Sequence, residues 1–181
     1  MGHKKDTPFQ PLQIAVLTVS DTRDESTDTS GRLLQDSLIT AGHNLADKQI
    51  VIDDIYKIRA IVSRWIASDD IQAVLITGGT GFTARDSTPE AIIPLFDKEV
   101  IGYGELFRKI SLDDIGTSTI QSRAVAGMAN RCVIFAMPGS TNACRTAWEG
   151  IIQSQLDSSY RPCNFVTELK QSTIEACETR G

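Results

Sequence analysis

Short runs of apolar residues alternate along this chain with longer stretches in which apolar residues recur at helical spacing. The apolar runs cover residues 12–19, 48–52, 71–77 and 132–137, and the amphipathic stretches cover 30–41, 55–66 and 141–156. Strands that are apolar on both faces are typical of a parallel sheet that helices cover on both sides. The pattern therefore predicts an α/β fold, a three-layer α/β/α sandwich with a mostly parallel central sheet.

Several residues indicate where the predicted helices begin and end. Gly42 follows the first helix, at a position where a left-handed residue is favoured. Ser87–Glu90 is typical of a helix start, with a hydroxyl cap, a proline in the first turn and an acid near the positive end of the dipole. Pro94 is expected to end that helix early. Residues 103–127 look only partly helical, and residues 157–181 show no clear pattern.

The composition is that of one globular domain. A chain of 181 residues, of which 41% are hydrophobic and 23% charged, is long enough to form one core. Its net charge of −5 disfavours duplex DNA and anionic membranes as partners, because both reward basic patches. No apolar run is long enough to span a membrane, and the N-terminus lacks the apolar stretch of a signal peptide. We therefore expect a cytoplasmic protein that binds neither nucleic acid nor membranes.

Three of the predicted strands end in loops of small and polar residues. These loops contain Ser20 and Asp21, then Thr77, Gly78, Gly79, Thr80 and Gly81, then Pro138, Gly139, Ser140, Thr141 and Asn142. Loops that follow parallel strands share one edge of the sheet, where ligands bind. Glycines let backbone amides approach an anion, so the loops favour a ligand that carries phosphate. A simple tight turn is the alternative for the middle loop, which matches neither the Walker nor the dinucleotide glycine motif.

Acidic residues lie near the same predicted edge. Asp86 follows the glycine loop by a few residues, and Asp53 and Asp54 follow the second strand. Such carboxylates can hold Mg²⁺ or orient a nucleophile beside phosphates. The alternatives are a solvated or helix-capping acid for Asp86, and a cap for the helix that begins near Ile55 in the case of the other two.

The residues that are missing exclude other chemistry. The chain has only His3 and His43, neither well placed as a general base, so a Ser-His-Asp hydrolase is disfavoured. The four cysteines are far apart and form no close pair, which favours structural thiols over a metal or redox site. Carboxylates, hydroxyls and backbone amides remain, an inventory that suits phosphoryl and nucleotidyl transfer. Arg85 and Arg123 lie near the candidate loops, although a surface ion pair is the ordinary role for each.

Five segments occur together in an order and spacing that resemble one family. They are Leu17–Asp21, Thr77–Gly81, Asp86–Ala91, Ser122-Arg123 and Met137–Ser140. The chain is similar to the MoaB/MogA family of molybdenum cofactor biosynthesis proteins over roughly residues 10–165. The stretch Ile115–Gly127 looks most like the MoaB branch of that family.

This resemblance implies a fold, an assembly and a reaction. The molybdopterin-binding domain would cover residues 11–165, between a flexible tail at 1–10 and a C-terminal tail at 166–181 that we expect at an oligomer interface. The family forms homotrimers, or hexamers built from two trimers. Its chemistry is adenylylation: the terminal phosphate of molybdopterin attacks the α-phosphate of Mg-ATP and releases pyrophosphate. The product is the substrate of a molybdate-insertion protein, which is an implied partner.

The resemblance also assigns residues to the site. The family's two functional aspartates fall on Asp53 and Asp86, which would act in catalysis and hold Mg²⁺. The implied binding residues are Ser20, Asp21, Thr77, Gly78, Gly79, Thr80, Gly81, Glu105, Ser111, Ser122, Pro138, Gly139, Ser140 and Asn142. For Glu105, a plain surface acid is the alternative.

The sequence departs from the adenylyltransferase pattern at two places, Phe82–Ala84 and Ile101–Tyr103. The MoaB branch also includes proteins that look like molybdopterin binders without one of the acids. Because Asp53 and Asp86 are both present, we favour an enzyme over a non-catalytic molybdopterin carrier. A hydrolase of nucleotide sugars or pyrophosphates, as in CinA-like relatives, is the more remote alternative.

Overall fold

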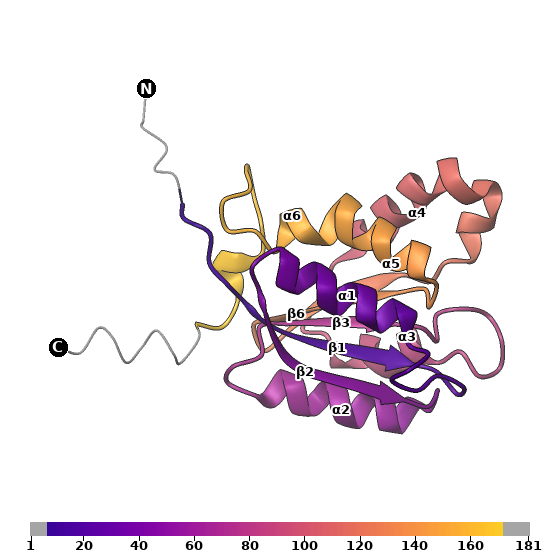
Figure 1. Ribbon diagram of the computed structural model, residues 1–181. Coiled ribbons are helices and arrows are strands. Elements are labelled where there is room, and N and C mark those ends of the chain that lie inside the picture. Colours follow the sequence, from indigo (N-terminus) through magenta and orange to yellow (C-terminus); the bar gives the residue numbers. More distant parts are fainter. Residues whose placement is uncertain (1–6, 172–181) are drawn as a thin grey trace.

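The computed structural model describes residues 7–171, which form a sheet of six strands between two layers of helices (Figure 1). The strand order is β2-β1-β3-β6-β5-β4. The strands are β1 (Gln13–Val19), β2 (Asn44–Val51), β3 (Ala73–Thr77), β4 (Lys98–Glu99), β5 (Val125–Ala129) and β6 (Cys132–Met137). β1 pairs in parallel with β2 and β3, and β3 with β6, whereas β5 runs antiparallel to β6 and β4. The predicted three-layer fold with a mostly parallel sheet is therefore confirmed.

Helices cover both faces of the sheet. They are α1 (Thr29–Thr40), α2 (Ile55–Ala67), α3 (Thr88–Ile92), α4 (Ile101–Ile115), α5 (Thr141–Ala147) and α6 (Gln153–Gln155). α1, α4 and α5 pack in one apolar cluster, and α2 and α3 pack in the other. Successive residues of β1 alternate between the clusters, with Ile14 and Val16 in the first and Ala15 and Leu17 in the second. This alternation explains why the strand is apolar on both faces.

The region from 103 to 127 is partly helical, as predicted, but it also leads into a strand that was not expected. α4 is followed by a 3₁₀ segment, Gly116–Gln121, and then by β5. β5 has the sequence VAGMA, whose small residues give little strand signal. Its Gly127 leaves room for the ring of Phe96, which a Cβ atom would meet at 2.2 Å. Packing against this ring and pairing with β6 place the segment in the sheet.

The predicted helix over 141–156 contains a π-helical turn at Trp148–Ile152 between α5 and α6. Pro94 falls in a short 3₁₀ segment, Ile93–Leu95, where α3 ends as expected. Within residues 7–171, no helix is long and apolar enough to cross a membrane.

Both ends of the described chain contact the domain. The backbone N–H of Gln10 donates to Ser158 Oγ at 2.8 Å, and that hydroxyl donates to the carbonyl of Pro8. Near the other end, Val166 and Leu169 are buried in the apolar cluster that also contains residues of α1 and α5. The rest of the two predicted tails, residues 1–6 and 172–181, lies outside the described residues.

The second histidine is a core residue. His43 is buried, accepts a hydrogen bond on Nδ1 from the backbone N–H of Leu12 at 3.2 Å, and packs between Phe9 and Trp148. Burial lowers the pKa of His43 to about 4, so the ring is neutral at physiological pH. Cys132 and Cys144 are buried free thiols, and Cys163 is an exposed one.

Candidate functional site

The loops that follow β1, β2, β3 and β6 meet at one edge of the sheet, because these four parallel strands are neighbours. Backbone hydrogen bonds join the loops. The N–H of Ser20 donates to the carbonyl of Val51 at 2.8 Å, and the N–H of Gly78 donates to that of Met137 at 3.0 Å. The predicted gathering of small and polar residues at the carboxyl ends of the strands is thus present.

Asp53 is a buried acid at this edge. Its Oδ1 accepts hydrogen bonds from the backbone N–H of Ser87 at 3.0 Å and from the Ser87 hydroxyl at 2.6 Å. Its Oδ2 accepts no hydrogen bond from any residue between 7 and 171. Burial raises the pKa of Asp53, and the negative charges of Asp86 and Asp21 add to the rise, against the hydrogen bonds from Ser87. The surroundings therefore disfavour the charged form of Asp53 relative to water, and one of its oxygens is left for a cation or a donor.

The position of Ser87 corrects one prediction. We expected its hydroxyl to cap α3, but it makes no capping hydrogen bond and donates to Asp53 instead. The capping role considered for Asp53 belongs to its neighbour. Asp54 caps α2 by accepting from the backbone N–H groups of Tyr56 at 3.0 Å and Lys57 at 2.9 Å. Asp53 is thereby free to face the candidate site.

Asp86 lies in the loop between β3 and α3. Its Oδ2 accepts from the backbone N–H of Thr83 at 2.8 Å and from the Thr83 hydroxyl at 2.6 Å. Burial acts to raise the pKa of Asp86, but the hydrogen bonds from Thr83 and Gly81 and the charge of Arg123 outweigh it and lower the pKa. The surroundings thus favour the ionised form of Asp86, whereas those of Asp53 raise its pKa.

Asp21 joins this cluster through the backbone. Its Oδ1 accepts from the N–H of Asp53 at 3.0 Å, and Arg85 donates to both of its oxygens at 2.8 and 2.9 Å. The Arg85 guanidinium, together with the N–H of Asp53, lowers the pKa of Asp21 to about 2. The ion pair expected for Arg85 therefore lies at the mouth of the candidate site.

The glycine loop approaches the acids closely. Gly78 and Gly79 have φ angles of +100° and +63°, which side chains rarely allow. A Cβ on Gly79 would lie 2.6 Å from Asp53 Oδ2, and one on Gly81 would lie 2.8 Å from Asp86 Oδ2. The loop thus brings its backbone close to both carboxylates.

The flanking threonines play a different part from the glycines. The Thr77 hydroxyl is buried, donates to the carbonyl of Pro138 at 3.2 Å and lies 3.1 Å from Cys144 Sγ. Thr80 is also buried. Both side chains anchor the loop in the domain, so any contact with a ligand would come from their backbone.

The loop after β6 packs against the glycine loop. A Cβ on Gly139 would lie 3.2 Å from the Cα atom of Gly78. Ser140 caps α5 by accepting from the N–H of Ala143 at 3.1 Å, and Asn142 donates to Asp114 Oδ2 at 3.3 Å. The predicted residues Pro138, Gly139, Ser140 and Asn142 therefore lie at the same edge as the acids.

Three predicted residues lie on or beyond α4. Glu105 is exposed and Ser111 is buried. The Ser122 hydroxyl is buried without a hydrogen-bond partner among the described residues. No hydrogen bond within that part of the chain links these side chains to Asp53 or Asp86. Their assignment to the site stays a prediction.

The donor set fits Mg²⁺ only together with a phosphate ligand. Within residues 7–171, no three His, Cys, Asp or Glu side chains are grouped so that they could hold a metal ion. Mg²⁺ is commonly bound through one or two carboxylates, several waters and the phosphates of a substrate. Asp53 and Asp86 are carboxylates of the kind that such a site uses.

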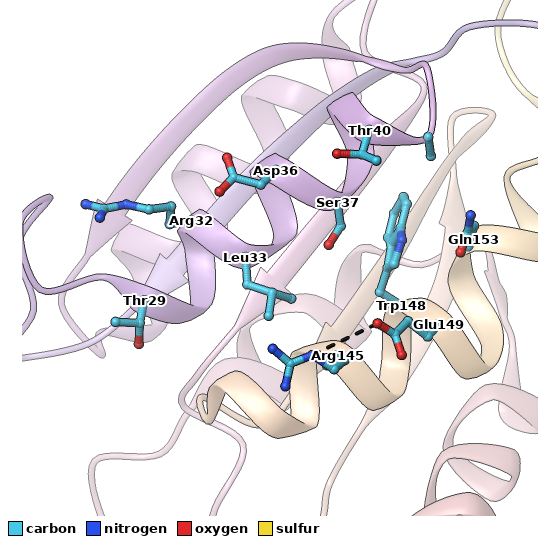
Figure 2. A pocket seen from close by; sticks show the side chains of 11 residues that line it. Thr29, Arg32, Leu33, Asp36, Ser37, Thr40, Arg145, Trp148, Glu149 and Gln153 are labelled. Carbon is cyan, nitrogen blue, oxygen red and sulfur yellow. Dashed lines mark ion pairs between the residues drawn. The ribbon is translucent and has the colours of Figure 1, made fainter.

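A groove elsewhere on the surface contains none of these acids. It lies between α1 and the helix that begins with α5, has a volume of about 570 Å³, and is lined by Leu33, Trp148 and several charged side chains (Figure 2). Its Arg145 and Glu149 form an ion pair at 4.0 Å. This mixed lining lacks the glycine loop and unpaired carboxylate of the candidate site.

The chain is similar over most of its length to known proteins. Residues 15–158 match the family described as a probable molybdopterin binding domain. The chain is 63% identical over 165 residues to molybdenum cofactor biosynthesis protein B of Escherichia coli K12, across 91% of this chain and 97% of that one. The Bacillus cereus protein of the same name is 46% identical over 155 residues, which is 85% of this chain and 91% of that one.

Solved structures share the fold. A crystal structure of a molybdenum cofactor biosynthesis protein B superposes with a TM-score of 0.79 at 46% identity, covering 81% of this chain and 92% of the other. The tungsten cofactor synthesizing protein MoaB from Pyrococcus furiosus gives a TM-score of 0.74 at 37% identity, with 83% and 94% covered.

Proposed function

This chain belongs to the family of probable molybdopterin binding domains, and from that membership we propose that it acts in molybdenum cofactor biosynthesis by binding molybdopterin and adenylylating its terminal phosphate with Mg-ATP. The observation that carries the proposal is the pair of carboxylates held against the glycine loop. Asp53 keeps one oxygen without a hydrogen bond from the described residues, and Asp86 is held ionised.

The reaction is a nucleotidyl transfer. An oxygen of the terminal phosphate of molybdopterin attacks the α-phosphorus of ATP, the bond from that phosphorus to the oxygen bridging to the β-phosphate breaks, and pyrophosphate leaves. Such transfers depend on positioning and on neutralising charge rather than on a covalent enzyme intermediate. This requirement suits a site without a usable histidine.

The residues at the carboxyl-end edge of the sheet have different roles in this reaction. In this proposal the glycine loop offers phosphate oxygens the N–H of Gly79, because the N–H groups of Gly78 and Gly81 already donate to Met137 and Asp86. Asp53 and Asp86 would hold Mg²⁺, which when bound neutralises charge on the triphosphate. Ser87 orients Asp53 by holding one of its oxygens, which leaves the other for the ligand.

A second candidate function is a carrier that holds molybdopterin without turnover. The family description, which names binding and no reaction, favours this alternative. A carrier needs the glycine loop but gains nothing from a buried charge at Asp53, which is why we prefer the enzyme. In either case the proposal includes a homotrimer or a hexamer and, as a downstream partner, a molybdate-insertion protein.

The test is direct. The purified protein is incubated with molybdopterin and Mg-ATP, and adenylylated molybdopterin is measured by mass spectrometry beside Asp86→Asn. The matched control is Asp97→Asn, because Asp97 also accepts from a backbone N–H, that of Asn130 at 2.7 Å, but lies far from the glycine loop in the fold. We expect product from the wild type and Asp97→Asn but none from Asp86→Asn.

Other outcomes would redirect the assignment. Molybdopterin that binds without product from any variant would leave a carrier. Cleavage of ATP or ADP-ribose in the absence of molybdopterin would indicate a hydrolase instead.

A further inference from the structure

Arg123 reaches from the segment before β5 to the loop that carries Asp86. Its Nε donates to the carbonyl of Thr80 at 3.2 Å and to that of Gly81 at 2.9 Å. Its Nη2 donates to the carbonyl of Asp86 at 3.1 Å, and its Nη1 forms an ion pair with Glu90. One partly buried guanidinium therefore contacts both ends of the loop and the first turn of α3.

The loop of residues 80–86 makes most of its other backbone hydrogen bonds with itself: the Asp86 carboxylate accepts from the N–H groups of Thr83 and Gly81, and the N–H of Arg85 donates to the Thr83 hydroxyl. Within residues 80–86, one hydrogen bond joins backbone to backbone, from the N–H of Asp86 to the carbonyl of Thr83 at 3.1 Å. Gly81 adds conformational freedom, and ordering such a segment costs entropy. The exposed ring of Phe82 covers the guanidinium, with 5.2 Å between Arg123 Cζ and the ring centroid. The three carbonyl contacts of Arg123 thus tie the loop to the segment before β5, whereas its other hydrogen bonds, apart from the Arg85–Asp21 pair, join residues of the loop to one another.

We propose that Arg123 is a positioning residue that holds the two ends of the loop at residues 80–86 and thereby sets the position of Asp86 relative to Gly78 and Gly79. It does so through backbone carbonyls and makes no contact with the carboxylate itself. The proposal rests on the proposed function for its effect on turnover, but not for its effect on the loop.

The planar fork of arginine is the feature that the arrangement requires. Arginine presents its five N–H donors in fixed directions, so one side chain reaches carbonyls on both ends of the loop. Lysine has a single ammonium on a flexible stem and would reach only part of this set. Arg123→Lys should therefore fall between the wild type and Arg123→Ala.

The chain offers a matched control. Arg131 makes the same kind of contact at the opposite edge of the sheet, where its Nε donates to the carbonyl of Glu168 at 3.2 Å and its Nη2 to that of Leu169 at 2.8 Å. Arg131→Ala removes an arginine that fixes a loop through carbonyls, without touching the site. A merely structural role for Arg123 would make the two alanine variants alike.

The experiment compares wild type, Arg123→Ala, Arg123→Lys and Arg131→Ala by two measurements. Amide hydrogen exchange of residues 79–88 reports the loop, and steady-state adenylylation reports kcat and KM. In Arg123→Ala we expect faster exchange in this segment and a kcat lower by about 10²-fold, because misplacing a catalytic group by about 1 Å has an effect of that size. We expect an intermediate kcat in Arg123→Lys, and wild-type exchange and kcat in Arg131→Ala.

Unchanged exchange of residues 79–88 in Arg123→Ala would overturn the proposal, as would a kcat equal to that of Arg131→Ala. If the wild type itself forms no product, adenylylation has failed and the molybdopterin Kd replaces kcat as the readout. Weaker binding in Arg123→Ala alone would then support the positioning role, and equal binding in both alanine variants would contradict it.

Discussion

Polar side chains at the two ends of the parallel strands differ in how far their hydrogen bonds are made within the chain. At the amino ends of the strands, Gln72 accepts from the N–H of Gln13 at 2.9 Å and donates to the carbonyl of Lys170 at 2.6 Å, while the Lys170 ammonium donates to the carbonyls of Ile66 and Ser68. At the carboxyl ends, Asp53 keeps an oxygen without a partner among the described residues.

This difference separates stability from function. A group whose hydrogen bonds are all made within the chain stabilises the fold and has nothing to offer a ligand. A carboxylate whose charged form is disfavoured by burial and that keeps one oxygen without a partner among the described residues is a candidate for ligand binding. The amino-end edge therefore closes the domain, whereas the carboxyl-end edge is prepared for a ligand.

The largest expected effect on turnover comes from removing the charge of Asp53. Asp53→Asn removes the charge, and we therefore expect turnover to fall by about 10²- to 10³-fold. The variant keeps an oxygen that accepts from Ser87, so the free energy of unfolding at pH 7 should stay equal or rise. The sign follows from the raised pKa: ionising Asp53 costs more in the folded chain, so its contribution to stability falls as pH rises above 3.8 through the folded pKa. Steady-state kinetics and urea unfolding check both parts.

The control for that variant is Asp47→Asn. Asp47 also accepts two hydrogen bonds on one oxygen, from Gln49 at 2.7 Å and Trp65 at 2.9 Å, but lies within β2. Lower stability with wild-type turnover is expected there. If Asp47→Asn reduces turnover as much as Asp53→Asn, the comparison between the edges is wrong.

The opposite result is expected at the amino-end edge. The Leu169 side chain is fully buried, and its carbonyl accepts a hydrogen bond from Arg131. Leu169→Ala should therefore lower the free energy of unfolding by about 2–5 kcal/mol. Turnover per folded molecule should stay within about twofold of the wild type. Urea unfolding gives the first quantity, and kinetics normalised to folded protein give the second.

The glycine loop gives an intermediate test. In Gly79→Ala the new Cβ would approach Thr88 Oγ1 at 2.4 Å and Asp53 Oδ2 at 2.6 Å, at a φ of +63°. We expect a loss of about 1–3 kcal/mol in stability together with weaker ATP binding, measured by unfolding and titration calorimetry. Gly116→Ala is the control, because Gly116 has a φ of +56° but nothing within 4 Å. It should share the backbone strain and keep the affinity.

The smallest effect concerns the Asp21–Arg85 pair. The pKa of Asp21, about 2, lies below the ordinary value of 3.8. The pair therefore stabilises the fold above pH 3.8, and this stabilisation is lost as pH falls toward 2. Arg85→Gln should flatten the acid end of a plot of unfolding free energy against pH. Arg145→Gln, which removes the 4.0 Å pair with Glu149, should leave that end unchanged.

The sequence predicts the parallel half of the sheet well, because strands buried on both faces must be apolar throughout. β1, β3 and β6 and the helices around them follow the predicted ranges closely, whereas β2 begins at Asn44 rather than at residue 48, because this edge strand is only partly buried and its first residues give no apolar run. The antiparallel half was missed at β4 and β5, since two residues of β4 and the small side chains of β5 carry no periodic signal. The burial of Val166 and Leu169 was missed for a similar reason, because so short a segment shows no period.

The site is predictable in its residue types but not in its contacts. The sequence places Asp53, Asp86 and the glycine loop at one edge, because loops after parallel strands meet there. It does not show that Ser87 holds Asp53 rather than capping α3, since both roles use the same hydroxyl. Nor does it show that Arg123 holds loop carbonyls in addition to the expected ion pair, because backbone acceptors leave no trace in side-chain pattern.

The central claim is that the carboxyl-end edge receives the ligand. Amide hydrogen exchange of the wild type, with and without molybdopterin and a non-hydrolysable Mg-ATP analogue, tests it most directly. We predict protection in residues 20–22, 53–54, 78–88 and 138–142, and no change at 66–72, 130–133 or 166–171. Protection confined to the groove between α1 and α5 (Figure 2) or to the amino-end edge would contradict the claim.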